Sequence, residues 1–320
     1  MVLISFLLLA ASLFYKIIAP MLLVISIGAL AQRARPLDIA TLSFLQVRVL
    51  LPAFLFVRLF ESTLSGRQIA TVAFTSLLIQ LLLGVVVYLA GRLRRVSPST
   101  LSATLLAATV FNAGNFGIPV AERAFGKVGG AVQACIVLAA NLSLWAVGYA
   151  LSAAIGGGKA GDAWDAIKTY FKLPMFWAMV AALALKGFHL VPPEPLLYPF
   201  RGMADTIVVL AQMTLGAQLM SQWRRPRWHI VLPVAALKLL GLPAMAALVV
   251  WALKLWPWPG ALIIVAAAGP TAVNTMLLAM EQGNDVELAA ECVFWTTLLS
   301  AITVTGVLTV VIALGGGPPP

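Results

Sequence analysis

Ten apolar runs separated by short polar connections make up most of this sequence of 320 residues. The runs are about as long as the ~20 residues that a helix needs to cross a bilayer, and much longer than the ~10 residues of a membrane β-strand. Their composition, rich in alanine, leucine and valine, is compatible with helix. We therefore expect an all-α polytopic membrane protein with spans near 9–31, 38–60, 68–91, 99–125, 129–155, 172–190, 202–222, 229–254, 259–282 and 287–314.

Two of these runs contain polar residues together with glycine and proline near their middle. They read NAGNFGIP at 112–119 and GPTAVN at 269–274. Proline removes a backbone donor and displaces the carbonyl four residues earlier, while glycine permits unwinding. Both runs are thus predicted to be interrupted helices with free backbone groups at membrane depth. Such groups persist only where they are buried in protein or line a wet cavity.

The chain is predicted to consist of two related halves. A shift of 157 positions places Gly126 on Gly283 and Cys135 on Cys292, and the interrupted helices are the fourth and the ninth. An odd number of helices in each half forces the second copy to insert upside down, which predicts inverted repeats. The expected boundaries are 1–155 for the first five-helix repeat, 156–171 for a cytoplasmic linker and 172–320 for the second repeat.

Composition and charge agree with a membrane protein. The chain is 62% hydrophobic and 10% charged, and its net charge of +10 is not accompanied by a nucleic-acid-binding motif. One set of connections carries eleven basic residues, Arg33, Arg35, Arg92, Arg94, Arg95, Lys159, Lys168, Lys172, Arg224, Arg225 and Arg227. The opposite set carries six, Arg67, Arg123, Lys127, Lys186, Arg201 and Lys254. The richer side is expected to be cytoplasmic, which places both termini on the other side.

Interrupted helices that meet in mid-membrane are typical of transporter binding sites. Their N-terminal ends carry partial positive charge and free N–H groups that suit an anion. Asn112, Asn115 and Asn274 would add amide donors and acceptors without burying a charge. The alternative, two kinked helices whose asparagines bond to neighbouring helices, stays open.

Four basic residues fall inside the apolar runs. Lys16 and Arg58 lie near span ends, and we expect them to extend to the membrane interface. Arg48 and Lys238 lie nearer the centres of their spans, where a cation costs roughly 2.5–3.5 kcal/mol. Each therefore needs a partner, a cavity or an anionic ligand, and neutralisation by carbonyls at a nearby helix break is an equal alternative.

The coupling ion is not determined by the sequence. Carboxylates that could couple transport to protons are Asp205, Glu281 and Glu291. Oxygen donors that could bind sodium near the interruptions are Thr271, Asn274, Thr275 and Gln282. No P-loop motif and no metal-binding spacing of the two histidines is present, so we expect neither ATP-driven transport, nor a cofactor, nor enzymatic activity.

Several segments resemble the auxin efflux carrier family, which includes bacterial malonate-type permeases and the plant PIN-FORMED auxin carriers. The segments are LPAFLF at 51–56, NAGNFGIP at 112–119, KLLGLP at 238–243 and PTAVN at 270–274. The resemblance covers nearly the whole chain. It implies ten helices with crossing broken helices four and nine, as in NhaA-like antiporters and bile-acid symporters, and frequently a homodimer.

The resemblance also implies that the helices form two domains with different roles. A scaffold domain would comprise about 9–60 and 172–222, and a transport domain about 68–155 and 229–314, with an elevator-like motion between them. The asparagine seven residues before the proline of the first crossing, here Asn112, would contact the carboxylate of the substrate. Plant members carry a proline near Thr275, a valine at the position of Asn274 and often a long cytoplasmic loop, so a small permease of a bacterial inner membrane fits better than an auxin carrier.

The sequence thus predicts a secondary active transporter of small organic anions that works by elevator-like alternating access. The surplus of cations in the spans favours carboxylates as its substrates. Its expected substrate-binding residues are Asn112, Asn115, Gly117, Pro119, Pro270, Thr271 and Asn274. Two alternatives stay open: a sodium-coupled symporter of the bile-acid type, and a non-transporting membrane sensor or assembly subunit.

Overall fold

The computed structural model describes residues 2–144, 155, 168, 170–223 and 225–318, and this part of the chain is helical. Seven helices are long and apolar enough to cross a membrane: Leu3–Ala34, Ile39–Phe60, Gly66–Leu93, Ala113–Leu142, Glu194–Ser221, Trp228–Ala252 and Val286–Ala313. Pro174–Gly187 is a shorter apolar helix. The predicted linker 156–171 and the end of the fifth predicted run lie mostly outside the described residues. The prediction of a polytopic all-α membrane protein is therefore confirmed at this level.

The individual elements follow the predicted runs closely. The first half contains α1 Val2–Leu13, η1 Phe14–Ile18, α2 Ala19–Ala34, α3 Ile39–Leu45, η2 Gln46–Leu50, α4 Leu51–Phe60, α5 Gly66–Leu93, α6 Pro98–Thr109, η3 Ala113–Gly117 and α7 Ile118–Leu142. The second half contains α10 Pro174–Gly187, α11 Glu194–Ser221, α12 Trp228–Ala236, η5 Leu237–Gly241, α13 Leu242–Ala252, α14 Gly260–Ala267, α15 Asn274–Glu281 and α16 Val286–Ala313.

Helix α11 begins eight residues before the predicted start of that span at 202, because it continues through Pro199. Pro199 is the sixth residue of α11, so the helix loses one backbone hydrogen bond there and still continues.

The π-helical turns η1, η2, η3 and η5 all precede a proline at the same distance. Each turn ends two residues before Pro20, Pro52, Pro119 or Pro243, which is the second residue of the following α-helix. A proline ring displaces the carbonyl four residues earlier, and a wider turn relieves this clash without ending the helix. Such wide turns are frequent at functional sites.

The chain reverses direction at two glycines with positive φ. Gly126 has φ 62° and ψ −158°, so α7 is two helices, 118–125 and 127–142, that meet at a kink. Gly283, in the turn between α15 and α16, has φ 66°. Only glycine adopts such angles without strain. These two positions are the pair that the shift of 157 places on each other.

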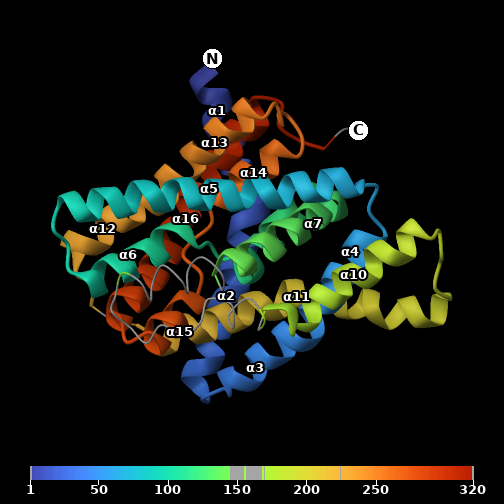
Figure 1. The fold of residues 1–320 in the computed structure, drawn as a ribbon, viewed down its shortest axis with the longest axis horizontal. Coiled ribbons are helices and arrows are strands. Elements are labelled where there is room, and N and C mark those ends of the chain that lie inside the picture. The colour runs from blue at the N-terminus through green and yellow to red at the C-terminus, as the bar shows by residue number, and fades with distance from the viewer. Residues whose placement is uncertain (1, 145–154, 156–167, 169, 224, 319–320) are drawn as a thin grey trace.

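The helices pack in two groups (Figure 1). In the first group, α11 lies against α2, α3, η2 and α4, and α10 lies against α4. In the second group, α5 lies against α6 and α7, and α12, α13, α14, α15 and α16 complete the bundle. Below, the two sets are called the α2–α11 group and the α5–α16 group.

The α2–α11 group is held together by a close approach of two helices. A Cβ atom added to Gly28 would overlap the carbonyl oxygen of Met213, and one added to Gly216 would overlap that of Ile25. Small residues let helices approach closely in membranes, where packing replaces the hydrophobic effect as the source of stability.

Candidate functional site

Two helices are interrupted where the sequence predicted it. Helix α6 ends at Thr109 and η3 starts at Ala113, while α14 ends at Ala267 and α15 starts at Asn274. The two interruptions touch each other: Phe111 and Thr271 form an antiparallel bridge. The amide of Asn112 donates to the carbonyl of Pro270 at 2.8 Å, and that of Ala272 donates to Val110 at 3.2 Å. We call residues 110–117 and 268–274 together the crossing.

The backbone groups freed at the crossing are largely satisfied by side chains. The Thr271 amide donates to Thr296 Oγ1 at 3.0 Å. The Thr271 hydroxyl donates to the carbonyl of Ala107, in the last turn of α6, at 2.7 Å. Thr271 and Thr296 are both fully buried. Because an unpaired buried backbone group is costly in free energy, these hydrogen bonds stabilise the backbone conformation of the crossing.

Asn112 is the central side chain of the crossing. Its Oδ1 accepts a hydrogen bond from the Asn115 amide at 3.0 Å and so caps the turn that follows. Its carbonyl accepts from Gly117 at 2.9 Å. Its Nδ2 is buried and has no hydrogen-bond partner among the described residues. A buried amide nitrogen without a partner is an available donor for a ligand.

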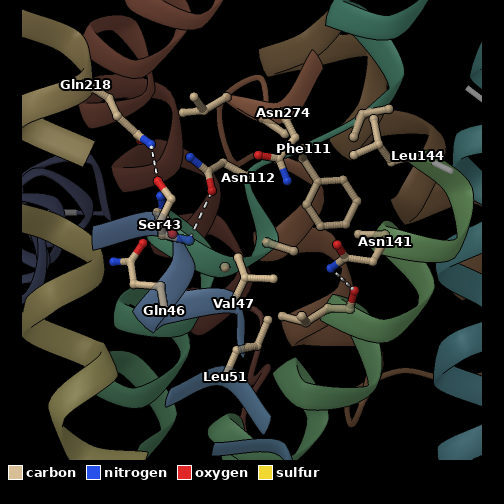
Figure 2. Close-up of a pocket in the computed structure, with 18 residues that line it drawn as sticks. Ser43, Gln46, Val47, Leu51, Phe111, Asn112, Asn141, Leu144, Gln218 and Asn274 are labelled. Carbon is tan, nitrogen blue, oxygen red and sulfur yellow. Dashed lines mark hydrogen bonds between the residues drawn. The ribbon is translucent and has the colours of Figure 1, made fainter. Parts of the chain in front are cut away.

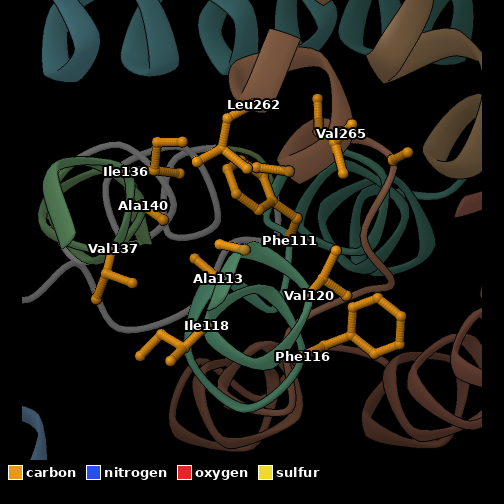
Figure 3. Close-up of a cluster of buried hydrophobic side chains, with 14 of the residues drawn as sticks. Phe111, Ala113, Phe116, Ile118, Val120, Ile136, Val137, Ala140, Leu262 and Val265 are labelled. Atoms are coloured by element: carbon orange, nitrogen blue, oxygen red, sulfur yellow. The ribbon is translucent and has the colours of Figure 1, made fainter. Parts of the chain in front are cut away.

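Gly117 and Gln133 explain how the first interruption is held. Gln133 Nε2 donates to the carbonyl of Ala113 at 2.8 Å. A Cβ atom at Gly117 would overlap this Gln133 nitrogen, so glycine is needed for the side chain to reach the backbone. Phe116 of the crossing packs in a cluster of buried apolar side chains that also includes Val120 and Leu262 (Figure 3).

A cavity of about 90 Å³ lies against the crossing. Its polar lining residues are Ser43, Gln46, Asn112, Asn115, Asn141, Gln218 and Asn274. In Figure 2, Ser43, Gln46 and Gln218 lie on one side of Asn112, and Asn274 and Asn141 lie on the other. The volume is sufficient for a few water molecules or a small polar group. Asn274 is exposed, and Asn115 and Asn141 are half-buried, so the cavity has access from outside the packed interior.

The electrostatics of this cavity come from dipoles. None of the described residues that line it is charged. The turn η3 and the helix α15 both begin at the cavity, with Ala113, Gly114 and Asn274 in its wall. Helix N-termini carry partial positive charge, so the cavity suits an anionic or strongly polar group.

The predicted site residues take different positions. Asn112, Asn115 and Asn274 line the cavity. Pro270 and Thr271 bond to the other interrupted helix and thereby hold the crossing together. Gly117 lines a smaller neighbouring cavity. Pro119 is buried at the start of α7.

The predicted sodium ligands do not all point to one place. The hydroxyl of Thr275 donates to the carbonyl of Ala272, while that of Thr271 donates to Ala107. Gln282, just after α15, is buried, and its Oε1 has no hydrogen-bond partner among the described residues. Sodium binding stays a prediction.

Sequence reasoning missed several residues of the site. Gln46, Asn141 and Gln218 come from three separate helices and line the cavity. Thr296 supports the crossing from α16. Each is a single polar residue in an apolar run, so no local pattern distinguishes it from a polar residue that bonds within its own helix.

The charged candidates differ in how they relate to the cavity. Lys238 is fully buried in η5, and its Nζ lies 5.0 Å from the centroid of the Phe111 ring. This nitrogen has no hydrogen-bond partner within the described part of the chain. Phe111 lines the cavity, so the Lys238 amine lies behind one wall of it. Arg48 in η2 and Glu281 at the end of α15 are exposed.

The expectation that Arg58 reaches the membrane interface is wrong. Its side chain is 3% exposed and forms ion pairs with Glu122 at 2.7 Å and Asp205 at 2.8 Å. Paired carboxylates from two other helices supply the compensation that a buried guanidinium needs. The sequence did not reveal this because both partners are distant along the chain.

Two comparisons with known proteins support a membrane transport protein. A sequence model of the family described as membrane transport protein matches residues 165–308. An uncharacterized transporter from Methanothermobacter thermautotrophicus is 25% identical over 268 residues, which cover 83% of this chain and 87% of the relative. Both matches support the auxin efflux carrier family, which the motifs of this chain resemble.

Proposed function

We propose that this chain is a secondary active transporter of small organic anions and binds a carboxylate group of its substrate at the crossing. One observation carries the proposal: among the residues that the structure describes, the buried Nδ2 of Asn112 has no hydrogen-bond partner, and it lies beside a cavity at which η3 and α15 begin. A carboxylate would accept from this nitrogen and from the N-terminal amides. The proposal involves no enzymatic step.

We also propose ten spans in two inverted repeats. The kink at Gly126 divides the apparent span Ala113–Leu142, so α6 and 118–125 act as two halves of one broken span. Helices α14 and α15 form the equivalent broken span in the second half, and α10 is a further, shorter span. The matching φ angles of Gly126 and Gly283 support the repeat.

An elevator-like motion between the two helix groups is the mechanism that we propose. Ser43, Gln46 and Gln218 belong to the α2–α11 group, whereas Asn112, Asn141 and Asn274 belong to the α5–α16 group. The cavity therefore lies at the boundary between the groups. Movement of the α5–α16 group along the other would carry the crossing, and a bound anion, across the membrane.

The orientation and the assembly of the protein belong to the same proposal. The basic residues support a cytoplasmic position for the connections that contain Arg33, Arg94 and Arg227, with both termini on the opposite side of a bacterial inner membrane. A homodimer and the coupling ion, proton or sodium, stay predictions. Stabilisation of the purified protein by sodium, or by carboxylates at low pH only, would separate the two forms of coupling.

Asn112→Asp tests the proposed binding site and leaves the fold intact. Aspartate keeps the acceptor that caps the Asn115 amide, but it removes the Nδ2 donor and places a negative charge in the cavity. Loss of one hydrogen bond to a charged group costs about 1.5–3 kcal/mol, so carboxylate affinity should fall roughly tenfold to a hundredfold.

Uptake of labelled dicarboxylates and indole acids into proteoliposomes is the assay. Gln212→Ala is the matched control, because Gln212 is a buried amide of α11 that donates to Val208 of its own helix. Asn112→Ala should also abolish transport while folded protein remains in the membrane. Transport by Asn112→Asp at the unmodified rate would refute the proposed site.

A further inference from the structure

We propose that Arg58, Glu122 and Asp205 form a lock between the two helix groups at the end of the molecule opposite the cavity, and that the lock opens when the transporter changes state. The inference rests on the proposed alternating-access function. We call these three residues the distal lock.

The lock joins the two groups through a single cation. Arg58 lies in α4, and its Nε and Nη2 donate to the two carboxylate oxygens of Glu122 at 2.7 and 3.2 Å. The same Nη2 donates to Asp205 Oδ1 at 2.8 Å. Glu122 lies in α7 of the α5–α16 group, while Asp205 lies in α11 of the same group as Arg58. One ion pair thus crosses the boundary and the other does not.

This arrangement allows the boundary pair to break. A guanidinium that lost its only carboxylate inside a protein would be left as an uncompensated charge. When Glu122 moves away, Asp205 remains beside Arg58 on the same helix group. The Asp205 side chain is 65% exposed and that of Glu122 is 14% exposed, so Asp205 can hold the cation in a more open state.

A glycine is required for the lock to close. Gly130 lies in the segment 127–142, which folds back after the kink at Gly126. A Cβ atom at Gly130 would overlap Glu122 Oε1 and would lie 3.2 Å from Arg58 Nε. Alanine at this position should push the carboxylate away from the guanidinium without removing either charge.

The lock and the cavity lie toward opposite ends of the same two spans. Ser43 lines the cavity and Arg58 lies fifteen residues later on one span, a rise of roughly 22 Å at 1.5 Å per residue. Asp205 and Gln218 are thirteen residues apart in α11, a rise of roughly 20 Å. The structure therefore joins the two groups by an ion pair toward one end of these spans, while the cavity lies toward the other end. A contact that closes one side of the binding site is what alternating access requires.

Other ion pairs of the described spans stay within one group. Arg201 of α11 pairs with Glu61, at the end of α4, and with Glu194 of α11. Arg227 precedes α12 and pairs with Asp285 and Glu291, at the start of α16. These pairs move with their group in an elevator motion and need not break. Glu61 is consequently a matched control for Glu122.

The test measures access to the cavity from the side of the lock. Asn141→Cys places a reporter thiol in the cavity wall, and the native Cys135 and Cys292 are buried. A membrane-impermeant maleimide is applied to intact cells and to inverted vesicles, so that each face is probed in turn. The reporter variant is combined with Glu122→Gln, with Gly130→Ala or with Glu61→Gln.

Glu122→Gln and Gly130→Ala should each raise the labelling rate from the face of the lock by about tenfold, the population shift that loss of one charge-assisted bond produces. Glu61→Gln should leave the rate unchanged. An unchanged rate in both lock variants, or an equal rise in all three, overturns the proposal. If neither Glu122→Gln nor Gly130→Ala gives folded protein in the membrane, the three residues stabilise the fold in every state, and the lock is refuted as well.

The test needs no substrate, so its outcome can be separated from that of the proposed substrate class. Uptake by the wild type together with equal labelling of Glu122→Gln and Glu61→Gln refutes the lock alone. Absence of carboxylate uptake together with the expected labelling pattern refutes the substrate class and leaves the lock standing.

Discussion

Thr296→Val is predicted to weaken the crossing through a single backbone amide. Thr296 Oγ1 accepts from the Thr271 amide at 3.0 Å and donates to the carbonyl of Cys292 at 2.6 Å. Valine has the shape of threonine but no acceptor. Because Thr271 and Thr296 are both fully buried, the freed amide has no access to bulk water. It would be left without a partner at the interruption of the helix.

The neighbouring residue provides a matched control for this substitution. Thr297 is also buried in α16, but its hydroxyl donates to Val293 of the same helix at 2.7 Å. The Val293 carbonyl keeps its helical hydrogen bond when that hydroxyl is removed. Thr297→Val should therefore change stability by less than about 0.5 kcal/mol, whereas an unsatisfied buried amide costs about 1–3 kcal/mol.

The assay is the apparent Tm of the purified protein in detergent, with hydrogen exchange of the Thr271 amide as a local measurement. A loss of 1–3 kcal/mol corresponds to a decrease of roughly 2–10 °C for a chain of this size. The Thr271 amide should exchange faster in Thr296→Val and at the wild-type rate in Thr297→Val. Equal Tm values for the two variants would show that Thr296 does not hold the second interruption.

Two further predictions concern packing and pH. Gly216→Ala should lower the apparent Tm, because the added Cβ overlaps a carbonyl of α2 at a cost of about 1–3 kcal/mol. Gly202→Ala is the control in the same helix: its Cβ meets no other atom, and it should gain up to about 1 kcal/mol from the higher helix propensity of alanine. Equal Tm values for the two variants would refute the close approach of α11 and α2. Burial acts to raise the pKa of Asp285, but hydrogen bonds from Arg227 and Leu288 and the charge of Arg227 outweigh it and lower that pKa. A lowered pKa gives stability that is present above the unfolded value of about 3.9 and is lost as pH falls through the folded value. Arg227→Gln should shift this loss to higher pH in melting curves recorded from pH 3 upward, and an unshifted curve would contradict the ion pair.

The positions of the spans could be predicted from the sequence because the bilayer imposes one simple requirement. Residues facing lipid must be apolar over the thickness of the hydrocarbon, and polar connections mark the ends. The predicted span 287–314 is the helix Val286–Ala313, and the predicted span 38–60 is Ile39–Phe60. The two helix interruptions could also be predicted from the sequence, since proline and glycine act on the backbone of their own helix.

The sequence also predicted Asn112, Asn115 and Asn274, which line the cavity. Only the tertiary structure decided which other side chains join them and which charges pair. Gln46, Asn141 and Gln218 stand in three helices with no local signal, and the Arg58 pair joins residues 64 positions apart along the chain. Such contacts depend on how the helices pack, and the bilayer requirement constrains each helix separately but does not specify its neighbours. Local chemistry therefore determined the spans and their breaks, whereas helix packing determined the site.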